Sequence, residues 1–142
     1  MTSLMLASEG RPFTPEAILK AVELTGASCS IQVLSIARIW GVALGFPNPW
    51  LLPSKREWSQ QRDQVADAIH ELKALGQTAN GSVIGARNPT KRIHAEALRL
   101  NCTAIVMSAD PPQNRLITDL LWSQEPYRLK KKAKMPVYLV LS

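Results

Sequence analysis

The stretch "NPTKRIHAEALRLNCTAIVMS", Asn88 to Ser108, decides the fold because it joins a helix to a buried strand through a very short turn. Asn88 can accept a hydrogen bond from the free N–H groups of a helix start, and Pro89 stands where a missing N–H costs nothing. One apolar helix face recurs at helical spacing, formed by Ile93, Ala97 and Leu100. The mostly apolar run Cys102–Ser108 is typical of a strand buried on both faces of a parallel sheet.

Helix start signals followed by apolar strands recur along the whole chain. Three more helices are predicted: from the Thr14–Pro15 cap to Gly26, from Ser54 through Trp58, Val65, Ile69 and Leu72, and from Ser123 with Pro126 in its first turn. Four more strands are predicted at Ser3–Ser8, Ser30–Ala37, Gln77–Gly85 and Met135–Ser142. Alternation of this kind predicts an α/β fold of three layers. We expect one domain over residues 1–142, with an open five-stranded parallel sheet in the order 3-2-1-4-5.

The reversal of strand order in such a sheet predicts where a ligand would bind. Ligands of open α/β sheets lie beyond the carboxyl ends of the strands, at the point where the order reverses. Here that point falls between the first and the fourth strand. The loops that follow these strands are Glu9–Arg11 and Ala109–Asn114. We therefore expect the functional cleft between these two loops.

The composition is that of an ordinary globular protein, with 142 residues of which 46% are hydrophobic and 20% charged. No apolar run approaches the roughly 18 residues of a membrane span, and the first residues lack the basic start of a signal peptide. We therefore expect a cytoplasmic protein without a membrane span. Cys29 and Cys102 form neither a disulfide framework nor a metal cluster, and we predict two reduced, buried thiols.

The net charge of +6 is concentrated in "RLKKKAK", Arg128 to Lys134. A solvated helix end explains this cluster, because cations are favoured at the carboxyl end of a helix. No aromatic residues are interleaved with the lysines as a stacking platform. From the sequence alone we therefore consider nucleic-acid binding unlikely.

The stretch from Trp40 to Leu52 is rich in proline, glycine and large apolar residues. Regular structure is unlikely over Arg38–Pro53 because three prolines and two glycines interrupt it. Its large apolar side chains either fold back over the carboxyl edge of the sheet or form an interface. In the first case they form a lid that fills the functional cleft, and a plain packed loop is the alternative to such a lid.

The chain resembles the universal stress proteins over nearly its whole length. "LASEG" (Leu6 to Gly10) resembles the end of the family's first strand, and "TGASCSIQVLSI" resembles its lead into the second. "IHAEALRLNCTAIVMS" resembles the third helix and fourth strand, and "MPVYLV" the closing strand. The resemblance implies the adenine nucleotide alpha hydrolase-like fold, with the sheet order given above. It also implies homodimers through the last strand, here Val137 to Leu141.

Many universal stress proteins bind ATP through G-x2-G-x9-G-[ST] after the fourth strand, and this motif is degenerate here. Ser108 and Pro111 stand at the first two glycine positions. Trp122, one residue later than the pattern requires, stands at the third and is followed by Ser123. A proline has no N–H to offer an anion, and its φ angle is fixed. Losing two charge-assisted hydrogen bonds would cost about 3–6 kcal/mol. We therefore predict that the loop does not hold ATP in the family's usual way.

The resemblance also implies which residues would line the cleft if a nucleotide were bound. They are Ala7, Ser8, Glu9, Gly10, Met107, Ser108, Asp110, Trp122 and Ser123. No spacing of histidines, cysteines or carboxylates indicates a catalytic or metal site, so we predict neither. The leading interpretation is a non-enzymatic stress-response protein that acts through dimerisation or partner binding. The alternative is a protein that binds ATP or AMP in the same cleft through altered contacts, with weak ATP hydrolysis left open.

Overall fold

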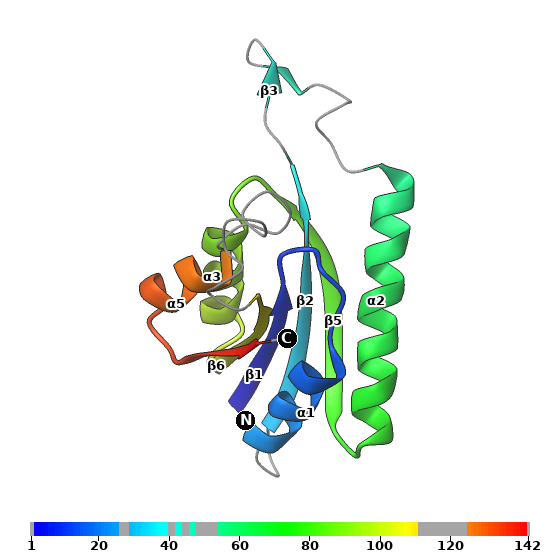
Figure 1. The fold of residues 1–142 in the computed structure, drawn as a ribbon, viewed down its shortest axis with the longest axis vertical. Coiled ribbons are helices and arrows are strands. Elements are labelled where there is room, and N and C mark those ends of the chain that lie inside the picture. The colour runs from blue at the N-terminus through cyan, green and yellow to red at the C-terminus, as the bar shows by residue number, and fades with distance from the viewer. Residues whose placement is uncertain are drawn as a thin grey trace.

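A computed structural model describes residues 2–25, 29–39, 42–43, 46–47, 54–110 and 125–141 of the chain. Its main sheet has five parallel strands in the order β5-β2-β1-β6-β7 (Figure 1). The strands are β1 (Thr2–Ser8), β2 (Cys29–Arg38), β5 (Thr78–Ala86), β6 (Cys102–Ala109) and β7 (Val137–Leu141). Counted along the chain, these five strands have the order 3-2-1-4-5. The predicted α/β class and sheet order are therefore confirmed.

In the described part of the chain, four helices cover the two faces of this sheet (Figure 1). They are α1 (Pro15–Leu24), α2 (Lys55–Ala74), α3 (Pro89–Arg99) and α5 (Glu125–Lys132). The three N-caps predicted within the described residues are confirmed, because each side chain accepts a backbone N–H three residues further on. The caps and their N···O distances are Thr14 at 3.2 Å, Ser54 at 3.1 Å and Asn88 at 3.2 Å.

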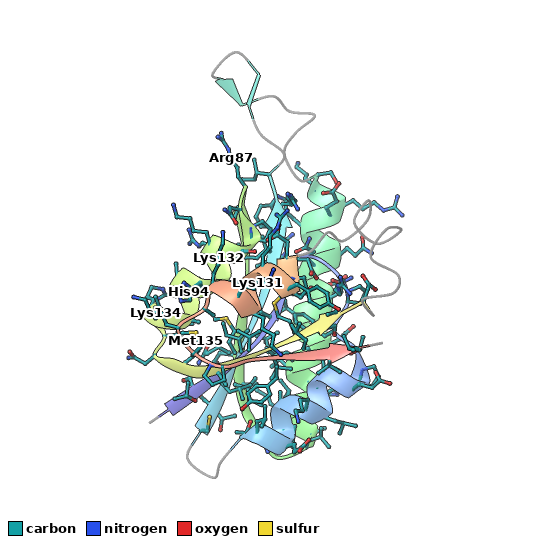
Figure 2. All side chains as sticks on the ribbon, turned by 60° about the vertical axis from the view of Figure 1, so that its left-hand side comes forward. Arg87, His94, Lys131, Lys132, Lys134 and Met135 are labelled. Atoms are coloured by element: carbon teal, nitrogen blue, oxygen red, sulfur yellow. The ribbon has the colours of Figure 1, made fainter. Side chains whose placement is uncertain are left out.

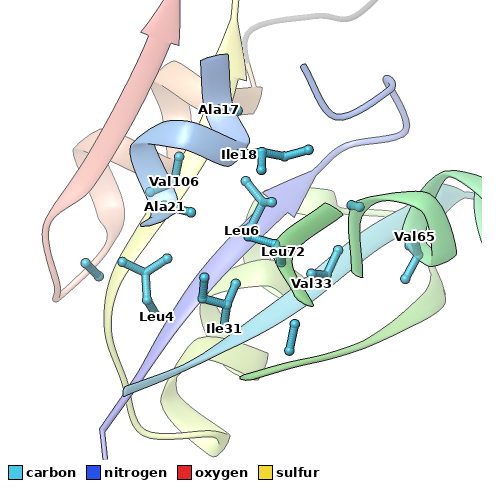
Figure 3. Close-up of a cluster of buried hydrophobic side chains, with 13 residues drawn as sticks. Leu4, Leu6, Ala17, Ile18, Ala21, Ile31, Val33, Val65, Leu72 and Val106 are labelled. Atoms are coloured by element: carbon cyan, nitrogen blue, oxygen red, sulfur yellow. The ribbon is translucent and has the colours of Figure 1, made fainter. Parts of the chain in front are cut away.

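The hydrophobic core is split between the two faces of the central strand, β1. Successive side chains of a strand point to opposite faces. Leu4 and Leu6 therefore pack with β2, α1 and α2, in the cluster drawn in Figure 3. Met5 and Ala7 pack on the other face with α3 and α5. All four side chains are almost completely buried. Burial on both faces explains the continuous apolar runs from which the parallel sheet was predicted.

Two helix ends next to the strands require a left-handed backbone. After α2, Gly76 has a φ angle of +84°, and its N–H bonds to the carbonyl of Lys73 at 3.0 Å. The N–H of Gln77 bonds to the carbonyl of Leu72 at 3.0 Å, which completes a Schellman turn. After α3, Asn101 has a φ angle of +56°, a conformation that asparagine tolerates better than most residues. These short turns lead each helix directly into the next strand.

Three segments differ from the sequence-based predictions. Helix α1 ends at Leu24, and Thr25 is already extended, with its hydroxyl bonded to the Ala21 carbonyl. Strand β2 continues to Arg38 because β5 pairs with it that far. A short antiparallel pair, β3 (Val42–Ala43) and β4 (Phe46–Pro47), lies in the stretch predicted to be irregular. None of the helices described here is both long and apolar enough to cross a membrane.

The two cysteines lie on the strands that flank β1. Cys29 pairs in register with Thr2, and Cys102 pairs with Ser3. Cys102 is buried, and burial raises the pKa of its thiol to about 11. Cys29 is only half-buried, so the prediction of two buried thiols is correct for one of them.

Candidate functional site at the switch point of the sheet

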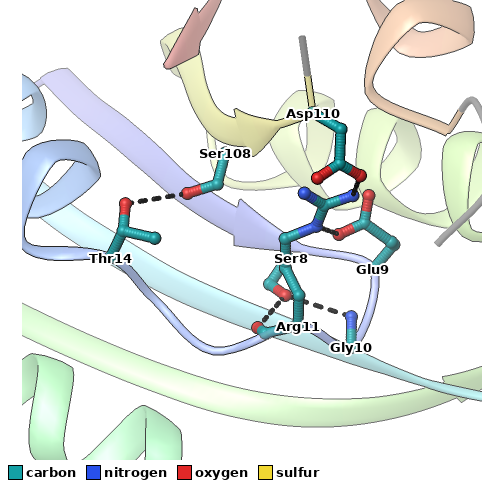
Figure 4. Close-up of polar contacts among 7 residues, drawn as sticks. All are labelled: Ser8, Glu9, Gly10, Arg11, Thr14, Ser108 and Asp110. Carbon is teal, nitrogen blue, oxygen red and sulfur yellow. Dashed lines mark hydrogen bonds and ion pairs between the residues drawn. The ribbon is translucent and has the colours of Figure 1, made fainter. Parts of the chain in front are cut away.

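The carboxyl ends of β1 and β6 lie side by side, at the point where the strand order reverses. Ala7 and Met107 are register partners there. The chain beyond β1 therefore meets the chain beyond β6, as Figure 4 shows for residues 8–11 and for Ser108 and Asp110. This confirms that the described parts of the two predicted loops converge. The position is the one at which open α/β sheets bind ligands.

The centre of this site is the side chain of Arg11. Its Nε donates to Glu9 Oε1 at 2.7 Å, and its Nη2 donates to Asp110 Oδ2 at 3.2 Å (Figure 4). Arg11 is buried although it is charged, with 7% of its surface exposed. A buried guanidinium is tolerated only when carboxylates compensate its charge. Arg11 therefore links the end of β1 to the end of β6 through an ion pair on each side.

Glu9 is the most perturbed carboxyl of the site. Loss of solvation on burial raises its pKa from 4.5 to about 7, although the Arg11 charge and hydrogen bond lower it. The charge of Glu125 raises it further. Its second oxygen, Oε2, is buried and has no hydrogen-bond partner among the described residues. Glu9 thus has one oxygen that accepts a hydrogen bond from Arg11 and one buried oxygen that lacks a donor among the described residues.

The hydroxyl groups at the strand ends hold the loop after β1 in place. Ser8 Oγ donates to the Arg11 carbonyl at 2.5 Å and accepts the Gly10 N–H at 3.0 Å. Gly10 has a φ angle of +127°, which only glycine adopts easily, so the sharp turn depends on it. Ser108 Oγ lies 3.1 Å from Thr14 Oγ1, the N-cap of α1. Neither serine contacts a general base among the described residues, so their observed role is structural.

A second buried carboxylate, Glu125, holds α5 against the start of α3. It accepts the backbone N–H of Thr90 at 3.2 Å and also the Thr90 hydroxyl. Arg128 Nη1 donates to it at 3.2 Å, and Arg38 Nη1 lies 3.7 Å away. The free N–H groups of a helix start favour an anion. Glu125 supplies that anion from within the chain, so this amide of α3 is already occupied.

The predicted site residues divide into three groups. Ser8, Glu9, Gly10, Ser108 and Asp110 come together at the switch point. Ala7 and Met107 are buried core residues directly beneath it. Trp122 and Ser123 lie outside the described residues, as do Pro111 and most of the Trp40–Leu52 stretch. The described residues contain no group of histidine, cysteine or carboxylate side chains that could hold a metal ion.

The pairing of Arg11 with Asp110 was not predicted, because 99 residues separate the two along the chain. The sequence nevertheless contained one usable signal. The reversal of strand order places both loops at one edge of the sheet, and a cation on one loop then faces a carboxylate on the other. The contact between Glu125 and Thr90 had no such signal, because it depends on how α5 packs against α3.

The chain has the universal stress protein fold. No family model matches the sequence, and no curated protein matches it. Solved structures of other proteins do match the fold of this chain. A universal stress protein from Archaeoglobus fulgidus superposes with a TM-score of 0.73 at 12% identity, covering 98% of this chain and 93% of that one. A universal stress protein from Burkholderia pseudomallei superposes with a TM-score of 0.71 at 16% identity, covering 98% of this chain and 95% of that one. The universal stress protein from Archaeoglobus fulgidus in complex with dAMP superposes with a TM-score of 0.65 at 14% identity, covering 98% of this chain and 97% of that one.

Proposed function

We propose that this chain is a universal-stress-protein-like domain that does not bind ATP in the family's usual way and acts by association with proteins. The observation that carries the proposal is Arg11, which is buried between Glu9 and Asp110 at the switch point. A phosphate at this position would compete with two carboxylates for one guanidinium. The degenerate glycine pattern of the sequence supports the same conclusion.

The charges of the switch point do not favour an additional anion. With Glu9 ionised, the trio of Glu9, Arg11 and Asp110 carries a net charge of −1. Two like charges about 4 Å apart repel by roughly 4 kcal/mol at an effective dielectric constant of about 20. A phosphate would therefore gain the attraction of Arg11 only by overcoming a repulsion of similar size from the carboxylates.

Association through β7 is the proposed mode of action. Strand β7 lies at the edge of the main sheet and pairs on one side with β6. Tyr138 and Leu141 of this strand are 37% and 51% exposed. An edge strand offers unpaired backbone groups and favours pairing with a second copy about a twofold axis. We therefore propose a homodimer in which Val137–Leu141 lies at the interface.

A nucleotide-binding protein with altered contacts is the second candidate. The observation that favours it is Glu9 Oε2, a buried acceptor without a donor among the described residues. An exocyclic amine of a nucleobase would supply such a donor. The solved relative in complex with dAMP supports a nucleotide rather than another amine. In this candidate function, Glu9 accepts a hydrogen bond from the nucleobase, and the phosphates lie away from Asp110.

Calorimetry separates the two candidates. Purified protein is titrated with ATP and, separately, with AMP at millimolar concentration. We expect no saturable heat for the wild-type chain. A dissociation constant in the low micromolar range for ATP would overturn the first candidate. Saturable AMP binding that is lost in Glu9→Gln but retained in the exposed control Glu71→Gln would establish the second.

Sedimentation equilibrium tests the proposed dimer. We expect the wild-type chain to dimerise at high micromolar concentration and Tyr138→Glu to be monomeric. The control Leu75→Glu places the same charge on an exposed leucine after α2 and leaves the dimer intact. A wild-type monomer, or equal loss of the dimer in both variants, would contradict an interface at β7.

A further inference from the structure

The positive charge of the chain is concentrated on one side of the fold. Residues 87–101 and 125–141 contain nine Lys or Arg and two Asp or Glu, a formal charge of +7 in a chain whose total is +6. The two acids, Glu96 and Glu125, are both buried. Arg92 and Arg99 pair with Glu96, and Arg128 pairs with Glu125. The exposed charge contributed by these two segments is therefore entirely positive.

The fold brings these cations together from two separate segments. Helix α3 packs against α5 through a shared core that includes Ile93, Ala97 and Leu129. The backbone N–H of Lys134 also donates to His94 Nε2 at 3.2 Å, which ties the turn after α5 to the middle of α3. The sequence alone indicated that the lysine cluster is a solvated helix end. In the structure it lies next to α3 and its cations.

We define the α3–α5 basic face by its exposed cations, which form no ion pair with any described residue. They are Arg87, Lys91, Lys130, Lys131, Lys132 and Lys134. Figure 2 shows Arg87, Lys131, Lys132 and Lys134 along one side of the molecule, with His94 among them. Lys91 lies on α3, three of the lysines lie on α5, and Arg87 and Lys134 lie next to these helices, so the fold gathers the cations on one face.

We infer that the α3–α5 basic face binds the phosphate backbone of duplex nucleic acid without reading its sequence. The two cations on the α3 side, Arg87 and Lys91, are four residues apart, which is roughly 6 Å at 1.5 Å per helical residue. At about 3.4 Å per phosphate on each strand, that length matches roughly two phosphates of one strand. The spacing of these cations thus fits a regular polyanion.

Two other polyanionic partners fit this face less well. Single strands are held by stacking on exposed aromatic rings. The aromatic residue of α5, Tyr127, is half-buried, and its hydroxyl donates to the Asp110 carbonyl. A membrane surface requires a row of apolar side chains beside the cations. Leu98 is the one large exposed hydrophobic residue on α3 or α5 in the described part of the chain.

The salt dependence of DNA binding gives the size of the expected effect. Each phosphate neutralised on B-DNA contributes about −0.9 to the slope of log K against log salt, so six cations give at most about −5.4. The affinity would then fall about 2,000-fold between about 50 and 200 mM salt. Removing three of the six cations reduces the slope to about −2.7.

The experiment measures fluorescence anisotropy of a labelled DNA duplex against the full chain over a range of salt concentrations. The test variant is Lys131→Gln/Lys132→Gln/Lys134→Gln. The charge-matched control is Lys55→Gln/Arg56→Gln/Lys73→Gln, which removes three exposed cations from α2 on the other side of the sheet. We expect the test variant to bind at least tenfold more weakly at low salt with the reduced slope. The control is expected to retain most of the affinity.

Three results would overturn the inference. The first is wild-type binding that salt does not weaken. The second is equal weakening in the test variant and the control, which would indicate an effect of net charge alone. The third is binding to vesicles that contain phosphatidylserine without binding to the duplex, which would assign the face to a membrane surface. Circular dichroism confirms that both variants are folded, so loss of binding cannot be confused with loss of structure.

Discussion

The buried carboxyl of Glu9 makes the stability of the protein depend on pH in a specific direction. Its pKa rises from 4.5 to about 7 on folding, chiefly because burial removes solvation. Between these two pH values the folded chain holds a proton that the unfolded chain releases. The contribution of Glu9 is therefore fully present below about pH 4.5 and is lost as the pH rises through about 7. At 1.36 kcal/mol per pKa unit, the loss is about 3 kcal/mol.

Urea unfolding of the wild-type chain and of Glu9→Gln from about pH 5 to about pH 8 measures this loss. Other groups titrate in the same range, so the informative quantity is the difference between the two free-energy profiles. We expect that difference to change by about 3 kcal/mol in favour of Glu9→Gln as the pH rises. The exposed control Glu71→Gln should run parallel to the wild type. A parallel profile for Glu9→Gln as well would refute the assignment of a buried, destabilised carboxylate.

Three further changes test the packing around the site and the sheet, each by urea unfolding. Arg11→Met leaves the buried Glu9 and the half-buried Asp110 uncompensated, and we expect a loss of about 3–5 kcal/mol at about pH 8. The control Lys20→Met removes a half-buried cation that pairs with the exposed Glu23 and lies 5.7 Å from the centre of the Tyr138 ring. It should cost about 1 kcal/mol, and a cost equal to that of Arg11→Met would contradict the argument. Gly81→Ala would place a Cβ 2.8 Å from the Val33 carbonyl oxygen, so we expect a loss of about 1–3 kcal/mol rather than a neutral change. Leu72→Ala opens a cavity beneath α2 and should cost about 2–5 kcal/mol, and a loss below about 1 kcal/mol would mean that this face is loosely packed.

The helices and strands were predictable because their signals are local, and the sheet order was predictable because topology constrains it. Thr14, Ser54 and Asn88 each cap a helix through an oxygen that reaches an N–H three residues away. The strands are continuous apolar runs because helices cover both faces of the sheet. Strand order follows from the handedness of the crossovers, and the family resemblance leads to the same order. Each of these rules depends on neighbouring residues or on topology.

The sequence predicted which loops form the site but not the contacts between their side chains. Glu9, Ser108 and Asp110 were placed near one another because the strand order reverses there. Arg11 lies in one of the predicted loops, but its pairing with Glu9 and Asp110 was missed because spacing along the chain does not encode the direction of a side chain. Glu125 was missed for the same reason. Its carboxylate reaches Thr90 across a helix packing that no local pattern specifies.

The position of β1 in the middle of the sheet has a consequence for biosynthesis. Met5 lies opposite Ile105 in the register of β1 and β6. A ribosome that adds about 5–20 residues per second needs roughly 5–20 s to synthesise the intervening chain. Throughout that interval one whole side of the innermost strand has no partner, so its backbone N–H and C=O groups stay unpaired. Completion of this sheet therefore waits for translation, and a chain stalled before Cys102 would expose a strand edge that favours aggregation.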